Sequence, residues 1–157
     1  RNIEIHNYAL SNKIGQVELR IPLRNKSIFK KNFEDFYEGG LATIHEENNL
    51  DNKIFDKFKT KSNFLDNINF NTKVGFIKID VEGHEQHILN GAENLIKKDK
   101  PNLLIEIEKK HRNDSVQITF DFLRNLGYKT YIFKDQKLNL IQDCLKENSV
   151  NYIFQIN

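Results

Sequence analysis

The clearest pattern of hydrophobic and polar positions lies in the second half of the chain. Residues 74–81 form a short, mostly apolar run, which is typical of a strand buried in a parallel sheet. Apolar residues then recur at helical spacings and predict an amphipathic helix from about Gly83 to Lys98, which Pro101 ends. A second apolar run at 103–107 predicts another buried strand. Because crossovers of this kind are right-handed and join parallel strands, we expect the two strands to be adjacent and parallel, with the helix packed across them.

The pattern continues to the end of the chain. Asp114 or Ser115 can cap a further helix, whose apolar stripe ends where Gly127 suits a C-terminal cap. Two final strands are predicted at 128–133 and 152–156, joined by a long polar connection. Since no helix is predicted between them, we expect these last two strands to pair antiparallel at one edge of the sheet.

The first half of the chain has weaker patterns. Ile3 and Ile5 alternate with polar residues and predict a half-buried strand, which a turn at 11–15 follows. Strict alternation from Val17 to Leu23 predicts a second strand, and Pro22 near its end suits an edge position. Residues 25–40 form a polar stretch, which we interpret as a short helix or a lid. Residues 54–64 predict a weak strand.

Composition and charge narrow the class of protein. The chain has 157 residues, of which 38% are hydrophobic and 29% charged, so we expect one globular domain over residues 1–157. We expect this domain to consist of two parts, residues 1–73 and residues 74–157. The net charge of +2 gives no reason to expect nucleic acid or a membrane surface as the partner. Cys144 is the single cysteine, and the chain has neither an apolar run long enough for a membrane span nor a basic leader, so a soluble, cytoplasmic protein is expected. The oligomeric state stays open.

Acidic residues cluster where the first buried strand ends. Ligands of open α/β sheets bind at the carboxyl ends of the strands, which singles out Asp80, Glu82 and either Glu106 or Glu108. Glu82 and Glu85 also precede or begin a predicted helix, where acids are stabilised by the helix dipole. Spacing alone therefore leaves a functional and a capping role open.

Three other motifs compete for a chemical role. Residues 80–83 fit the loose D-x-x-G pattern of nucleotide switches, but the chain has no matching phosphate loop. His84 and His87 resemble the zinc-protease helix with the second histidine one residue too early. Such a pair could hold a metal, but we interpret it as a solvated helix face. Cys144 has no evident partner and is expected to be a small, semi-buried residue.

The strongest motif resembles a known family. Residues 77–85 read I-K-I-D-V-E-G-H-E, and they are followed by I-L-N-G-A at 88–92, by K-P at 100–101 and by a strand ending in Glu106. This order is similar to the signature of FkbM-type methyltransferases. Three shorter similarities support this one. A-L-S-N at 9–12, with Gly15, is similar to a turn of the family, and Leu65-Asp66 is similar to the family's T-L-D, with Phe64 in place of Thr. Gly127-Tyr128 with Phe133 is similar to the family's closing segment.

The resemblance implies a fold and an activity. The fold would be a Rossmann-like class I methyltransferase sheet, parallel with an antiparallel closing edge. The activity would be S-adenosylmethionine-dependent O-methylation of a small-molecule or saccharide acceptor, on a sugar or natural-product hydroxyl. Asp80 would lie near the methionine end of the cofactor or the acceptor, and Glu82 would be a general base or an acceptor anchor. Ala9 and Leu10 would contact the adenine, and no metal is required.

One departure from the family pattern matters. The family's D-x-G-A-N-x-G cofactor loop and the strand ending in Glu-Pro do not occur in this chain, which implies a sheet truncated at its N-terminus. We therefore expect this chain alone to bind S-adenosylmethionine weakly, to be inactive, and to expose the edge of the strand at 74–80 to self-association. Two alternatives remain: a non-catalytic α/β binding module, and a carboxylate–metal hydrolase that uses Asp80 and Glu82.

Overall fold

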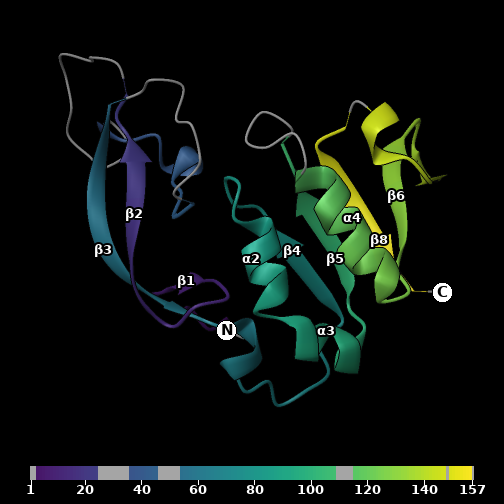
Figure 1. Cartoon of the computed structure of the whole chain (residues 1–157), viewed down its shortest axis with the longest axis horizontal. Helices are drawn as coiled ribbons and strands as arrows, with labels where there is room; N and C mark the ends of the chain where they lie inside the picture. Colours follow the sequence, from purple (N-terminus) through teal and green to yellow (C-terminus); the bar gives the residue numbers. More distant parts are fainter. Residues whose placement is uncertain (1–2, 25–35, 46–53, 109–114, 148, 157) are drawn as a thin grey trace.

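The computed structural model describes residues 3–24, 36–45, 54–108, 115–147 and 149–156 (Figure 1). Within these ranges the chain has a mixed α/β fold with two β-sheets, one of three strands and one of five. The larger sheet and its helices come from the second half of the chain, and the smaller sheet comes from the first half. No helix in the described ranges is both long and apolar enough to cross a membrane.

The five-stranded sheet confirms the main prediction for the second half. The strands are, in spatial order, β4 (Phe76–Ile79), β5 (Asn102–Glu106), β8 (Asn151–Gln155), β6 (Lys129–Lys134) and β7 (Lys137–Ile141). Strands β4 and β5 are adjacent and parallel, as the two apolar runs predicted. The other three neighbouring pairs are antiparallel, and the last strand, β8, lies between β5 and β6, so the antiparallel part is not confined to one closing edge as predicted. β4 therefore forms one edge of the sheet.

The helix predicted from about Gly83 to Lys98 is two helices, α2 (Glu85–Asn90) and α3 (Glu93–Asp99). The break falls at Gly91, where the backbone of Ser11 comes so close that an added Cβ would lie 2.2 Å from the Ser11 carbonyl oxygen. The prediction of a single helix was wrong because this contact comes from a distant segment. The buried face was predicted correctly, since Ile88 and Leu89 are 6% and 0% exposed.

Asp66 holds the two helices at this break. Its backbone N–H donates to the carbonyl of Gly91 at 3.0 Å. Its carboxylate accepts hydrogen bonds from the backbone N–H groups of Asn94 and Leu95, at 3.1 and 2.8 Å. These N–H groups lie in the first turn of α3, where they have no partner within the helix. Asp66, in the turn η2 (Leu65–Asn67), thus caps α3 from outside.

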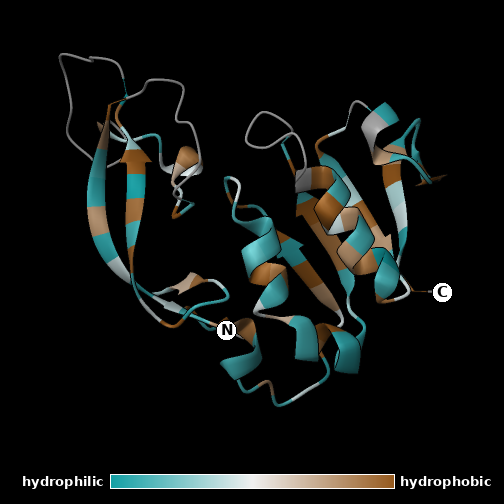
Figure 2. Ribbon diagram, viewed as in Figure 1, coloured by the Kyte–Doolittle hydropathy of each residue, from teal (hydrophilic) through white to brown (hydrophobic). Residues whose placement is uncertain are grey.

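The main core lies between the five-stranded sheet and α4 (Ser115–Asn125). Phe120 of α4 packs edge-on against the rings of Tyr152 and Phe154, each with centroids 5.5 Å apart. Figure 2 shows hydrophobic residues along the central strands and on the sheet-facing side of the helix. Gly127, with φ +88°, ends the helical segment as predicted.

The long polar connection contains a strand that the sequence did not reveal. β7 pairs with β6 through a turn at Asp135 and Gln136, which both have left-handed backbone angles, with φ of 54° and 59°. Two successive residues of this kind are typical of tight hairpins. Leu138 and Leu140 of β7 are 44% and 53% exposed, and only Ile141 at its end packs against the core. The turn η3 (Cys144–Lys146) follows, and Cys144 is fully buried rather than semi-buried.

The three-stranded sheet has the order β1 (Ala9–Leu10), β3 (Phe55–Asn63) and β2 (Gly15–Pro22). β2 and β3 pair antiparallel, and β2 is an edge strand with Pro22 at its end, as predicted. Residues 3–7 are not in a strand, and Ile3 and Ile5 are 76% and 88% exposed. That prediction was wrong because no described segment pairs with these residues.

The polar excursion predicted at 25–40 is only partly described. Residues 25–35 lie outside the described ranges, and the excursion ends in the turn η1 (Gly39–Leu41). Beyond it, Thr43 pairs with Arg20 of β2 through two backbone hydrogen bonds of 2.9 and 3.0 Å. These bonds attach the segment 36–45 to the three-stranded sheet.

Candidate functional site

A cavity of about 590 Å³ lies along the exposed edge of β4. The four residues to which the family resemblance gives a role, Ala9, Leu10, Asp80 and Glu82, line it, whereas Glu106 and Glu108 do not. The remaining lining is mostly apolar and comes from both sheets and from the segment 36–45, as with Leu19, Ile44, Leu65, Phe70, Phe76 and Ile79. Its size is within the range of small-molecule sites, which are largely apolar with a few convergent polar groups.

Asp80 follows β4 directly, at the carboxyl end of the strand. Its carboxylate pairs with the ammonium group of Lys78, with Nζ and Oδ2 2.6 Å apart. This hydrogen bond and the charge of Asp80 raise the pKa of Lys78. Both side chains are about half exposed, 53% for Lys78 and 48% for Asp80, so the pair is accessible from the cavity.

A hydrogen bond from Thr43 holds the backbone of Glu82. The hydroxyl of Thr43 donates to the carbonyl oxygen of Glu82 at 2.7 Å. The same hydroxyl accepts the backbone N–H of His45 at 3.0 Å. Thr43 is 3% exposed, so this link is shielded from water. No local pattern pointed to Thr43, because its partner Glu82 is distant along the chain.

Further acids lie beside these two. The pKa of Glu106 is raised first by burial and then by the negative charges of Asp80, Glu108 and Glu82. These acids are therefore close enough to interact at the carboxyl ends of β4 and β5, where the sequence predicted them. Together they give this end of the cavity a negative potential.

Glu85 has a structural role at the start of α2. Its carboxylate accepts the backbone N–H of Gly83 at 3.0 Å, and the side chain is 4% exposed. Burial raises the pKa of Glu85 to about 7 even though two backbone hydrogen bonds oppose the shift. For Glu85 the capping interpretation is therefore correct. The turn that presents Glu82 to the cavity depends on it.

Ala9 and Leu10 form β1, whose only described ladder is the parallel pairing with β3. Ser11 follows, and its N–H donates to the carbonyl of Asn63 at 2.9 Å. The Ser11 hydroxyl lies 3.0 Å from Nε2 of His84. Ser11 thus connects the first half of the chain to the start of α2, a contact that sequence spacing could not reveal.

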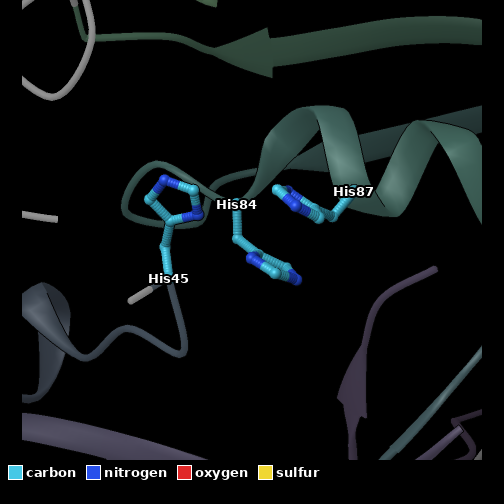
Figure 3. A group of neighbouring side chains, drawn as sticks. All are labelled: His45, His84 and His87. Atoms are coloured by element: carbon cyan, nitrogen blue, oxygen red, sulfur yellow. The ribbon is translucent and has the colours of Figure 1, made fainter. Parts of the chain in front are cut away.

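The interpretation of His84 and His87 as a solvated helix face was wrong. His84 is 8% exposed and His87 is half-buried. They lie against His45, itself 5% exposed, and one ring nitrogen from each of the three residues lies within 4.8 Å of the others (Figure 3). These three residues, called here the histidine cluster, could hold a metal ion.

The comparisons with known proteins agree with the motifs. Residues 1–130 match the family model described as the methyltransferase FkbM domain. The chain therefore belongs to a methyltransferase family, and that family is FkbM. No curated protein matches it.

Among solved structures, the chain is similar to the crystal structure of methyltransferase FkbM from Methylobacillus flagellatus KT. The sequence identity is 21% and the TM-score is 0.44. The match covers 61% of this chain and 23% of that one, so this chain spans less than a quarter of that protein's length.

Proposed function

We propose that the protein transfers a methyl group from S-adenosylmethionine to a hydroxyl oxygen of a sugar or natural product, on a Rossmann-like sheet. The single observation that supports this proposal most is the cavity beside β4. Four residues that the family resemblance marks, Ala9, Leu10, Asp80 and Glu82, come from distant segments and line the same cavity.

The cavity fits the chemical groups of the cofactor. Its apolar walls at Ala9 and Leu10 suit the flat adenine ring. The carboxylates of Asp80 and Glu82 complement the positive charges of the sulfonium and the amino group. Asp80 would hold the methionine end, because it lies at the strand end with its carboxylate partly exposed.

S-adenosylmethionine supplies an electrophilic methyl group, and the protein must position the acceptor and receive its proton. As the carbon–oxygen bond forms, the methyl–sulfur bond breaks and S-adenosylhomocysteine leaves. The acceptor hydroxyl loses its proton in the same step, and the Glu82 carboxylate would take it. The hydrogen bond from Thr43 fixes the backbone of Glu82, so the carboxylate is presented at a set position. The apolar walls exclude water, and the rate gain comes mainly from this positioning.

Methyl transfer by the full-length protein tests the proposal, with labelled S-adenosylmethionine and a panel of hydroxyl acceptors. Asp80→Asn and Glu82→Gln should each lower kcat/KM at least about 100-fold, the usual contribution of a positioned acid or base. Asp121→Asn, an exposed acid of α4 paired with Arg124, is the matched control and should leave the rate unchanged.

The Glu82→Gln variant also separates the two roles considered for Glu82. If Glu82 is the general base, the substitution should lower kcat and remove the acidic limb of the pH profile. If Glu82 is an anchor, the substitution should raise KM modestly and leave kcat nearly unchanged, because glutamine keeps one hydrogen-bonding oxygen but loses the charge. Turnover near the unmutated level in both the Asp80 and Glu82 variants would show that neither acid takes part in the reaction.

A further inference from the structure

We propose that His45, His84 and His87 bind one Zn²⁺ ion at the wall of the cavity. This site is additional to methyl transfer and does not depend on it. The sequence contains five histidines, and three of them meet in this cluster although one comes from a separate segment (Figure 3).

His45 is held in place by its backbone. Its N–H donates to the hydroxyl of Thr43 at 3.0 Å, and its carbonyl accepts a hydrogen bond from the guanidinium of Arg20. The Thr43 hydroxyl in turn bonds to Glu82, two residues before His84. The two segments that supply the histidines are therefore fixed to each other by hydrogen bonds, as a pre-organised metal site requires.

His84 has the arrangement of a metal ligand with an outer partner. Its Nε2 lies 3.0 Å from the Ser11 hydroxyl, and its Nδ1 is buried and makes no hydrogen bond. If Nε2 carries the proton and donates it to Ser11, Nδ1 has a lone pair that accepts no hydrogen bond. Histidines that bind metals commonly donate their other ring N–H in this way, which fixes the ring and its tautomer.

Charged groups of both signs surround the cluster. Lys13 acts on His84, whereas the carboxylates of Glu82 and Glu108 act on the adjacent Glu85. His84 itself is buried, and a neutral imidazole is the form that coordinates metals.

The ring nitrogens of the cluster lie farther apart than the ligands of a bound zinc ion would. Ligand nitrogens of a tetrahedral zinc site, at bonds of 2.0–2.1 Å, are about 3.4 Å apart, whereas the cluster nitrogens lie within 4.8 Å. The rings of His84 and His87 are stacked, with 7° between their planes and centroids 4.3 Å apart. Lone pairs of parallel rings do not converge, so one ring must turn about its Cβ–Cγ bond. His87 is half-buried, whereas His84 is 8% exposed, so the ring of His87 is the less enclosed of the two.

Three imidazoles and one open position are the donor set of many zinc sites in which water or a substrate completes the tetrahedron. His84 and Thr43 also line the cavity, so the ion would lie at its wall. Imidazole is a good ligand for zinc, and a single ion would fasten segment 36–45 to the start of α2.

Calorimetric titration of Zn²⁺ into chelator-treated full-length protein tests the site directly. We expect the unmutated protein to bind one ion per chain. His45→Ala and His87→Gln should each weaken the affinity for Zn²⁺ at least about 100-fold, which is more than the removal of an outer partner usually causes. Ser11→Ala should weaken binding about 10- to 100-fold, because it removes such a partner. His6→Gln is the control, since His6 contacts Glu4 outside the cluster.

Nitrogen NMR of the histidine rings provides a readout that does not depend on any variant folding. In the unmutated protein, added Zn²⁺ should shift the Nδ1 resonance of His84 and one ring nitrogen of His45 and of His87. The proposal is overturned if no saturable binding occurs, if these resonances do not move, or if folded His45→Ala and His87→Gln variants bind as tightly as the unmutated protein.

Discussion

Gly91 and Ser11 approach so closely that a Cβ on Gly91 would lie 2.2 Å from the carbonyl oxygen of Ser11. Backbone atoms cannot yield at such a distance as the tip of a flexible side chain can. The contact joins two of the motifs that resemble the FkbM family, A-L-S-N and I-L-N-G-A. It also explains in physical terms why the second motif has glycine at this position.

We expect Gly91→Ala to lower the free energy of unfolding by about 1–3 kcal/mol, the usual cost of forcing extra atoms into a packed site. Urea denaturation measures this change in the free energy of unfolding. Gly75→Ala is the matched control, since a Cβ there has no neighbour within 4 Å, and it should change stability by less than about 0.5 kcal/mol. Equal stability of the two variants would mean that Ser11 moves aside without cost.

A second prediction concerns the cap on α3. Asp66→Ala removes the acceptor for the N–H groups of Asn94 and Leu95, and we expect a loss of about 1–2 kcal/mol, as for other capping residues. Asp66→Asn keeps one acceptor oxygen and should lose less. Amide hydrogen exchange across α3 locates the effect, and unchanged protection of the first turn of α3 in Asp66→Ala would contradict it.

The alkaline limit of stability follows from two buried tyrosines. Burial raises the pKa of Tyr128 and of Tyr152 to about 12, against an ordinary value of 10. In the unfolded chain both ionise at the lower pH, so the stability they contribute is complete below about pH 10 and is lost as the pH rises from about 10 to 12. Ultraviolet titration of the folded protein should show both phenols ionising late.

Phenylalanine variants isolate this effect from other alkaline changes. Tyr152→Phe should flatten the fall in urea midpoint between about pH 10 and 12, because the ionising group is gone. Tyr128→Phe should do the same. Both variants should also lower stability at neutral pH, since the carbonyls of Pro101 and Ser149 lose hydrogen bonds of 2.9 and 2.8 Å. A fall of the same steepness in both variants would show that other groups cause it.

A fourth prediction concerns the cofactor. The 157-residue chain lacks the family's glycine-containing loop and the acid that would hold the ribose, so it should bind S-adenosylmethionine no more tightly than the millimolar range. Each lost hydrogen bond costs on the order of 1 kcal/mol, and about 1.4 kcal/mol is a tenfold change in affinity. Saturable micromolar binding in a calorimetric titration would show that the cavity beside β4 is sufficient for the cofactor.

The parts of the fold that the sequence predicted are those whose signals are local. The parallel pair β4 and β5 follows from two apolar runs with a helix between them, and the end of α4 follows from Gly127. The break between α2 and α3 could not be predicted, because it depends on Ser11 and Asp66, which are distant in sequence. Strand β7 was missed because only Ile141 at its end packs against the core and its turn has no glycine.

The same distinction applies to the candidate site. Asp80 and Glu82 could be found because strand ends of α/β sheets collect ligands. His45 could not be joined to His84 and His87, since no spacing rule connects a loop with a helix so far along the chain. Thr43 was missed for the same reason, although its hydroxyl links Glu82 to His45.

The hairpin of β6 and β7 occupies the edge of the five-stranded sheet opposite to β4, where the cavity lies. Its turn at Asp135 and Gln136 is exposed and already has a backbone suited to glycine-rich sequences. A peptide tag or a fluorescent label inserted there would leave the cavity and the histidine cluster untouched. The two edges thus keep a turn that is open to insertion apart from the cavity and the histidine cluster.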